Sequence, residues 1–417
     1  MQFKFFGGAQ EVGRSSIMVE DERRVMLDYG MKVEDKNHEF PIGLPNIDAM
    51  VLSHAHLDHS GDSPSIYNKL AIPIFGTEAT KKTTMLLLED TLKIAKNQHA
   101  EINFHRRQYK DFIRHYQSME YREVEHFGKF DISLYDAGHI SGSAITLMEN
   151  PQSKDYKRIV YTGDYKLESQ LLHKGAEIVK SDVLITESTY ANRDHTDRGE
   201  LSKAFINDVK AVLDNKGTAL VPVFAVGRSQ EILALLHKNG LAESTYVDGM
   251  ARAATKIALE FPECIGNYDL LADAVNKANF ISDTDMREEA MGQPSIILTT
   301  AGMLSGGPVL DYITRLNKDS KIFLTGYQVE GTNGRMLLDS GKIKVYNSFK
   351  PVKTPVSIYD FSAHCGKSDL YRYIRESAPN VVICVHGSAE NTTGFASELK
   401  AEGFDAYAPK VGDTIKL

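Results

Sequence analysis

The sequence predicts an α/β protein in which one domain is inserted into another. The chain has 417 residues, more than a single hydrophobic core usually organises, so two domains are expected. Short strand-like segments with polar ends occupy both ends of the chain, whereas the middle alternates continuous apolar segments with helical patterns. We therefore predict a first domain over residues 1–192, an inserted domain over 193–348 and a return segment over 349–417.

The first domain begins with short alternating segments separated by glycine, which is typical of β-hairpins. Early strands are predicted at 3–6, 16–20, 24–28 and 49–53. Residues 78–117 then carry helical signals, with a broad apolar face that includes Met85, Leu88 and Leu92. Later strands are predicted at 130–135, 144–148, 158–162 and 183–186.

The middle of the chain has a different pattern. Its apolar segments, which lack clean alternation, lie at 218–224, 244–247, 295–300 and 321–325. Helical patterns intervene at 228–238, 251–260 and 308–316. Continuous apolar strands separated by helices predict a parallel sheet covered on both faces. After residue 348 short strands return, at 356–359 and 381–385.

Composition limits the cellular setting. No segment approaches the ~18 apolar residues of a membrane span, and the N-terminus lacks the pattern of a signal peptide. Cys264, Cys365 and Cys384 form no C-x-x-C pair, which favours a reducing compartment, and we expect the cytoplasm. The net charge of -8 is mildly unfavourable for a nucleic-acid binder, although two divalent cations would add about four positive charges. The basic residues between 80 and 115 are interpreted as a solvated helical face.

The run His54-Ala55-His56-Leu57-Asp58-His59 is the strongest functional signal. Three imidazoles and one carboxylate lie within six residues at the end of an apolar segment, a spacing that packing does not explain. His54 and His56 can point to the same side of an extended segment, and Asp58 and His59 can reach a second ion. Imidazole nitrogen and carboxylate oxygen suit zinc and, to a lesser extent, manganese or iron. The run therefore predicts a site for two metal ions.

Three further candidate ligands follow apolar strands elsewhere in the chain. His139 follows Asp136-Ala137-Gly138, Asp164 follows Thr162-Gly163, and His386 follows Val385. The glycines leave room for a close approach to a metal ion. An aspartate can bridge two ions because it has two oxygens, and Asp164 is predicted to do so.

These residues resemble the ligand motifs of the metallo-β-lactamase superfamily, and Asp28 in Leu27-Asp28-Tyr29-Gly30 resembles its first motif. Three more segments resemble the added motifs of the β-CASP nucleases: Thr186-Glu187-Ser188-Thr189-Tyr190, Phe361-Ser362-Ala363-His364 and Val385-His386-Gly387. Segments 222–228 and 326–332 are similar to the nuclease subunit of the cleavage and polyadenylation specificity factor. The resemblance covers essentially the whole chain and is nearest the short archaeal form without KH domains. It implies an αββα metallo-β-lactamase sandwich with an inserted β-CASP domain.

The resemblance also implies roles. One zinc ion would be held by His54, His56 and His139, a second by Asp58, His59 and His386, with Asp164 bridging them. Asp28 would support a ligand or a loop from behind. Hydrolysis would proceed by a metal-activated hydroxide, with His364 as general acid and Glu187 as its carboxylate partner. The catalytic positions are thus predicted to be Asp58, Asp164, Glu187 and His364.

Single-stranded RNA is the substrate that the resemblance implies. Glycine-rich turns at 300–307 and 326–334 can offer backbone N–H groups to phosphate, and the candidate contacts are Arg228, Ser305, Gly306, Gly307 and Arg335. No aromatic-rich RNA-binding signature accompanies them. Endonuclease and 5′-to-3′ exonuclease action both stay open, as do zinc or manganese and a homodimer. The alternatives are a glyoxalase-II-like hydrolase of small molecules and a catalytically silent RNA-binding subunit.

Overall fold

The computed structural model describes residues 1–33, 38–98, 100–345 and 348–417, which form two compact units. The first unit comprises residues 1–169, 174–194 and 364–417, and the second comprises 170–173 and 195–363. The chain thus leaves the first unit after residue 194 and returns at residue 364, where the sequence placed these boundaries at 192/193 and 348/349.

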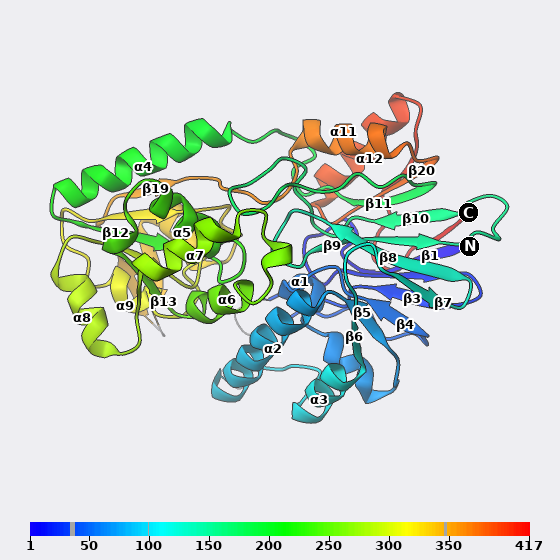
Figure 1. Cartoon of the computed structure of the whole chain (residues 1–417), viewed down its shortest axis with the longest axis horizontal. Helices are drawn as coiled ribbons and strands as arrows, with labels where there is room; N and C mark the ends of the chain where they lie inside the picture. Colours follow the sequence, from blue (N-terminus) through cyan, green and yellow to red (C-terminus); the bar gives the residue numbers. More distant parts are fainter. Residues whose placement is uncertain (34–37, 99, 346–347) are drawn as a thin grey trace. The chain divides into compact units, whose positions relative to one another are not determined.

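The first unit is built on two sheets of seven strands each (Figure 1). The strands of one sheet, in spatial order, are β22 (Thr414–Lys416), β1 (Gln2–Gly7), β2 (Ser16–Glu20), β3 (Arg24–Leu27), β4 (Ala49–Val51), β5 (Ile74–Gly76) and β6 (Tyr116–Ser118). Those of the other are β21 (Asp405–Tyr407), β20 (Val381–Val385), β11 (Val183–Glu187), β10 (Arg158–Tyr161), β9 (Ala144–Glu149), β8 (Phe130–Asp136) and β7 (Val124–Phe127).

The two sheets pack face to face around one apolar core. Phe3, Phe5 and Val51 from the first sheet meet Ile132, Ile159 and Ile383 from the second within this core. Helices cover both outer faces: η1 (Ser63–Asn68), α2 (Glu78–Gln98) and α3 (Arg106–His115) on the first sheet, and α11 (Lys367–Ser377) and α12 (Ala389–Ala401) on the second. The predicted αββα sandwich is confirmed.

The predicted helical region 78–117 contains the helices α2 and α3, but its last two residues belong to strand β6. Residue 99 lies outside the described residues. The second helix, α3, starts anew because the side chain of Gln108 accepts a hydrogen bond from the backbone N–H of His105, its N-cap residue, at 3.1 Å. Across the helices that the structure describes, none has the combined length and apolar character needed to cross a bilayer.

The second unit contains a six-stranded sheet in which every pair of neighbours is parallel. Its order is β14 (Asn279–Phe280), β13 (Thr245–Asp248), β15 (Ser295–Thr299), β12 (Thr218–Pro222), β16 (Lys321–Leu324) and β19 (Val356–Ile358). Strands β17 (Lys342–Val345) and β18 (Ser348–Pro351) pair with each other antiparallel. Because β19 pairs with β16, residues 356–358 belong to this unit, which explains why the chain returns to the first unit as late as residue 364.

Helices cover both faces of this parallel sheet, as the continuous apolar strands predict. One face packs against α4 (Arg198–Asp214), α5 (Arg228–Lys238), α6 (Ala251–Ala258) and α7 (Tyr268–Lys277). The opposite face packs against α8 (Thr284–Gly292), α9 (Val309–Ile313) and α10 (Asn333–Ser340). The short 3-10 helices are η2 (Ala242–Ser244) and η3 (Pro262–Cys264). Neighbouring strands β12 and β16 are therefore followed by helices on opposite faces, α5 and α10.

Candidate metal centre and catalytic residues

All seven predicted ligands lie just beyond strand ends of the first unit. His54 and His56 follow β4, and Asp58 and His59 lie in the short helix α1 (Leu57–Ser60) that comes next. The remaining three follow β8, β10 and β20: His139, Asp164 and His386. Strands β10 and β20 run parallel to β11 between them, so their carboxyl ends meet at one edge of the second sheet. The fold thus brings together side chains that are up to 332 residues apart in the chain, because His386 and His54 are at those positions.

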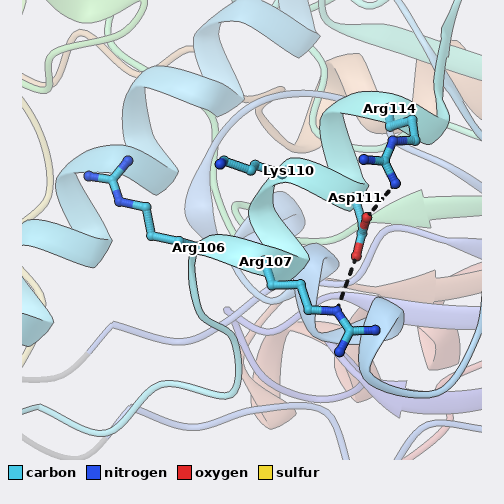
Figure 2. A pocket seen from close by; sticks show the side chains of 5 residues that line it. All are labelled: Arg106, Arg107, Lys110, Asp111 and Arg114. Atoms are coloured by element: carbon cyan, nitrogen blue, oxygen red, sulfur yellow. Dashed lines mark hydrogen bonds and ion pairs between the residues drawn. The ribbon is translucent and has the colours of Figure 1, made fainter.

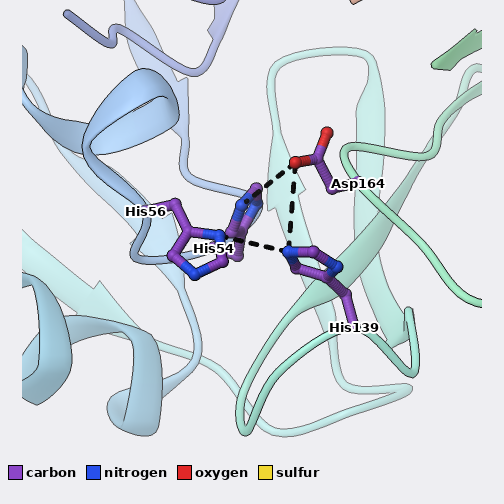
Figure 3. A group of neighbouring side chains, drawn as sticks. All are labelled: His54, His56, His139 and Asp164. Atoms are coloured by element: carbon purple, nitrogen blue, oxygen red, sulfur yellow. Dashed lines mark hydrogen bonds and ion pairs between the residues drawn. The ribbon is translucent and has the colours of Figure 1, made fainter. Parts of the chain in front are cut away.

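Three imidazoles and one carboxylate form a first group (Figure 3). His56 Nδ1 lies 3.1 Å from His139 Nε2. Asp164 Oδ2 lies 3.6 Å from His54 Nε2 and 3.9 Å from His139 Nε2. One ligand atom from each of the four residues falls within 4.8 Å of all the others. This spacing suits a single cation held among them.

A second group adjoins the first and shares Asp164 with it. Asp164 Oδ1 lies 3.3 Å from His59 Nε2 and 3.3 Å from His386 Nδ1. Asp58 Oδ2 lies 3.2 Å from His386 Nε2 and 4.0 Å from His59 Nε2. These four residues also meet the 4.8 Å criterion. One oxygen of Asp164 therefore faces the first group and the other oxygen faces the second.

The backbone next to Asp164 has to be glycine. Gly163 has a φ of 54°, and a Cβ there would lie 2.7 Å from Cβ of Ser53. A side chain at residue 163 would therefore force apart the two strand ends that carry His54 and Asp164.

Asp28 supports the centre from behind through its hydrogen bonds. Its Oδ1 accepts from the Ser53 backbone N–H at 2.7 Å, and its Oδ2 accepts from the Ser53 hydroxyl and the Tyr161 hydroxyl, each at 2.7 Å. His59 Nδ1 lies 2.7 Å from the same Oδ2, so a proton on Nδ1 leaves Nε2 to face Asp164. Asp28 adopts a φ of 59°, a region that costs a non-glycine residue free energy, and these bonds offset that cost.

His364 and Glu187 form a pair beside the shared carboxylate. His364 Nδ1 lies 2.9 Å from Glu187 Oε2 and 3.9 Å from Asp164 Oδ2. Glu187 is buried, and the Tyr165 N–H and the Thr189 hydroxyl, at 3.0 and 2.5 Å, donate to its two oxygens. Burial by itself would lower the pKa of His364, but the Glu187 and Asp164 carboxylates raise it to about 9. A protonated imidazole is thus available at neutral pH.

The ligand atoms of both groups are arranged to bind a cation rather than to hydrogen-bond with one another. Within the described part of the chain, His54 Nε2, His59 Nε2 and Asp164 Oδ1 are buried with no hydrogen-bond partner, a state that is costly without an ion. Burial lowers the pKa of His54 well below its usual value and also lowers the pKa of His56, so both rings are neutral, the form that binds metal. Burial opposes the charge of Asp164, but His386 and His59 hold the pKa of its carboxyl well below its usual range.

Comparison with known proteins places the chain in a family. Residues 229–337 match the family described as "Beta-Casp domain", residues 350–409 match "Zn-dependent metallo-hydrolase RNA specificity domain", and residues 9–212 match "Anti-Pycsar protein Apyc1". The chain is 37% identical to "Probable RNase MJ4" of Methanocaldococcus jannaschii over 100% of both chains. It belongs to the β-CASP family of metallo-β-lactamase nucleases.

Two further relatives match over most of this chain. "RNase aCSPSF2" of Saccharolobus solfataricus is 35% identical, over 99% of this chain and 85% of the relative. "Transcription termination factor FttA" of Methanothermobacter thermautotrophicus is 32% identical, over 94% of this chain and 68% of the relative. A solved structure of a protein of unknown function from Enterococcus faecalis V583 has a TM-score of 0.64, with 15% identity over 100% of this chain and 99% of that one, and supports the fold alone.

The candidate RNA contacts of this β-CASP chain all lie in the second unit. Arg228 begins α5, and its guanidinium hydrogen-bonds to the backbone oxygen of Thr325. Ser305, Gly306 and Gly307 lie in the turn after β15, and Arg335 lies in the first turn of α10, paired with Asp339 at 2.9 Å. These turns follow three adjacent strands, β15, β12 and β16, so the candidates gather at one edge of the sheet.

The basic residues of α3 form an open surface (Figure 2). Arg106, Arg107, Lys110, Asp111 and Arg114 line a shallow hollow made by a single helix. Asp111 Oδ1 lies 3.0 Å from Arg114, and the Arg107 side chain is 84% exposed. The four basic residues are exposed and Asp111 is half-buried, in keeping with a solvated helical face.

Sequence reasoning missed several supporting residues. Ser53, Tyr161 and Thr189 position Asp28, Glu187 and their partners, yet each is an ordinary polar residue beside a recognised motif. Thr189 lies within the segment that suggested Glu187, and Tyr161 lies three residues before Asp164, so proximity to a motif was the available signal.

Proposed function

We infer that the chain is a metal-dependent ribonuclease, and we propose that its centre holds two zinc ions. The observation that carries this proposal is that the two oxygens of Asp164 face different groups of ligands. Its Oδ2 faces His54 and His139, and its Oδ1 faces His59 and His386. Carboxylates that divide their oxygens in this way suit two-metal hydrolytic sites. The relatives named as ribonucleases, which match over nearly the whole chain, support RNA as the substrate.

His54, His56 and His139 would hold one ion, Asp58, His59 and His386 the other, and Asp164 would bridge them. When bound, the ions would supply an activated water and neutralise charge that develops on the phosphodiester. Asp28 fixes the tautomer and orientation of His59. It also acts on His54 indirectly, because the Ser53 hydroxyl that donates to Asp28 lies 3.0 Å from His54 Nδ1. The protein thereby positions the nitrogen donors around one shared carboxylate.

We assign the general acid to His364. Cleavage of a phosphodiester leaves an oxygen on the departing ribose, which needs a proton. Glu187 holds His364 by Nδ1, and the pKa of His364, about 9, keeps the ring protonated at neutral pH. Thr189 and Tyr165 in turn fix Glu187, so the proton donor is held rigidly beside Asp164.

Single-stranded RNA is the proposed substrate form, with Arg228, Ser305, Gly306, Gly307 and Arg335 as phosphate contacts. Zinc is favoured by the imidazole-rich donor set. A homodimer and a cytoplasmic location stay predictions, the latter in keeping with three buried cysteines that form no disulfide within the described chain. A glyoxalase-II-like role and a silent RNA-binding role are not favoured, because the His364–Glu187 pair and every candidate ligand are present.

The test is RNA cleavage by the metal-loaded chain. Single-stranded RNA labelled internally or at the 5′ end should be cut by the wild type, and the products should separate endonucleolytic from exonucleolytic action. EDTA should abolish cleavage, and zinc should restore it. Asp164→Ala and His364→Ala should each cleave at least a hundredfold more slowly.

The matched control is His126→Ala, which removes an imidazole that is 79% exposed on β7 of the same unit and should cleave like the wild type. The proposal fails if the metal-loaded wild type leaves RNA intact, or if both site variants match His126→Ala.

A further inference from the structure

Two aromatic side chains lie exposed at the ends of neighbouring strands in the second unit. Phe224 follows β12 and is 39% exposed, and Tyr327 follows β16 and is 55% exposed. Among the residues that the structure describes, the one other phenylalanine or tyrosine with comparable exposure is Phe349, on strand β18. Exposed aromatic rings forgo the free energy of burial, so two of them at one sheet edge indicate a site where another molecule binds.

We propose that Phe224 and Tyr327 form a stacking platform for unpaired nucleobases of single-stranded RNA. This inference rests on the proposed ribonuclease function and deepens it by assigning base contacts in addition to phosphate contacts. Every nucleobase has an apolar face, so aromatic stacking holds a strand without demanding a particular sequence.

The topology of the parallel sheet supports a binding site at this place. In open α/β sheets, ligands bind beyond the carboxyl ends of strands, where adjacent strands send their connections to opposite faces. Strands β12 and β16 are adjacent and parallel, and their following helices, α5 and α10, pack on opposite faces. Phe224 and Tyr327 follow these two strands, so they lie where the two connections diverge.

Hydrogen bonds hold the three turns at this edge together. The Arg228 guanidinium, at the start of α5, donates to the Thr325 backbone oxygen, and the Thr325 hydroxyl donates to the Pro222 oxygen at 3.0 Å. The Gly334 N–H donates to the Met303 oxygen at 2.9 Å, which ties the turn after β15 to α10. A Cβ on Gly302 would lie 2.9 Å from the Phe224 nitrogen, so glycine lets these turns close on each other. The rings are therefore presented by a fixed scaffold.

The surroundings of the two rings fit a nucleic acid better than an apolar protein partner. Val329, at 42% exposed, is the one other large apolar side chain exposed in the described turns after these two strands. Near them lie Arg228, which bonds to the Thr325 oxygen, and Arg335, which is paired with Asp339 beside Tyr327, together with the polar, glycine-rich turn at 305–307. A stable protein interface needs about 800 Å² of surface from each partner, with a continuous apolar centre. Two rings beside guanidinium groups match alternating bases and phosphates instead.

The test measures binding of fluorescently labelled single-stranded oligonucleotides by anisotropy. The full chain would carry Asp164→Asn so that the probe stays intact, which a gel verifies. One probe is a uridine oligoribonucleotide, and the other has the same backbone with abasic positions in place of the bases. Phe224→Ala and Tyr327→Ala should each weaken binding of the base-bearing probe by about fivefold to a hundredfold. Binding of the abasic probe should stay unchanged, since backbone contacts are intact.

Two matched variants sharpen the result. Tyr327→Phe keeps the ring and should bind like the parent, whereas Phe349→Ala removes an exposed ring elsewhere and should also bind like the parent. The platform is refuted if the alanine variants bind both probes as the parent does, or weaken both probes equally. It is also refuted if they change the oligomeric state in sedimentation while RNA binding is kept.

Failure of this inference is distinguishable from failure of the proposed function. Cleavage of RNA by the metal-loaded wild type tests the ribonuclease, and base-dependent binding tests the platform. With cleavage intact, Phe224→Ala and Tyr327→Ala should raise KM and leave kcat unchanged for short substrates. A ribonuclease that cleaves RNA yet shows no base-dependent change in either variant retains the proposed function and loses the platform.

Discussion

Replacing Asp28 with asparagine should weaken metal binding although Asp28 is not one of the seven predicted ligands. Four donors converge on its two oxygens at 2.7 Å: the Ser53 N–H, the Ser53 hydroxyl, His59 Nδ1 and the Tyr161 hydroxyl. An asparagine has one acceptor oxygen and places an NH₂ group against the remaining donors. His59 then loses the bond that fixes its tautomer, and Nε2 no longer faces Asp164 reliably.

The size of the effect follows from those bonds. Partners of metal-bound histidines typically change metal affinity by 10- to 100-fold, which is about 1.4 to 2.7 kcal/mol. Each hydrogen bond to a charged acceptor also contributes about 1.5–3 kcal/mol to stability. We therefore expect Asp28→Asn to lower the metal affinity of the Asp58–His59–His386 group by at least tenfold. The affinity of the group that contains His54 should fall less, because Asp28 contacts His54 only through Ser53.

The assay is a zinc titration against a competing chelator, with thermal unfolding measured alongside. The control is Asp248→Asn, which alters an equally buried carboxylate in the second unit, bonded to Arg287 and Tyr312 at 2.8 Å each. It should lower stability and leave zinc affinity unchanged. If Asp28→Asn binds zinc within twofold of the wild type, the reasoning about His59 is wrong.

Three further predictions follow from the same structure. His364→Ala should lose at least a hundredfold in rate on RNA and recover most of it on a substrate whose leaving ribose oxygen is replaced by sulfur, because that group departs without a proton; equal losses on both substrates, measured by single-turnover kinetics, would rule out a general acid. Glu187→Gln should shift the falling limb of the pH–rate profile to lower pH, because the carboxylate that raises the pKa of His364 to about 9 is gone; an unchanged profile would exclude His364 as the group observed. Burial raises the pKa of Asp62 from 3.8 to about 7, so the folded state holds this proton more tightly and the wild type loses stability as pH rises from about 4 to about 7. Asp62→Asn should therefore unfold in denaturant with a free energy up to about 4 kcal/mol higher than the wild type at pH 8 and similar to it near pH 4; a constant difference across that range would contradict the assignment.

Much of the candidate metal centre can be predicted from the sequence because its residues follow the ends of predicted strands. An apolar run that ends in a polar residue predicts where a side chain leaves a sheet, and parallel strands bring such ends to one edge. For that reason the sequence alone joins His139, Asp164 and His386 to the 54–59 run. The seven ligand roles stay predictions, and the structure supplies the distances that make them testable.

Contacts between segments far apart in the chain could not be read in this way. The hydroxyl of Tyr161 bonds to Asp28 across 133 positions, and an ordinary strand tyrosine gives no sign of such a partner. The apolar pattern of strand 356–358 suits a sheet of the first unit or the sheet of the second unit. Its pairing with β16 places it in the second unit. Exposure has the same limit, because the apolar segment 218–224 gives no sign that Phe224 is exposed, and the glycine-rich turn 326–334 gives none for Tyr327.

The zinc content of the purified chain tests the central claim most directly. After saturation and removal of loosely bound metal, elemental analysis should find two zinc ions per wild-type chain, one for each group of ligands. His386→Ala should retain one ion, and Asp164→Ala should retain fewer than two because both groups lose an oxygen. A wild type that holds a single ion at saturation, or an Asp164→Ala variant that still holds two, would contradict a centre built on one shared carboxylate.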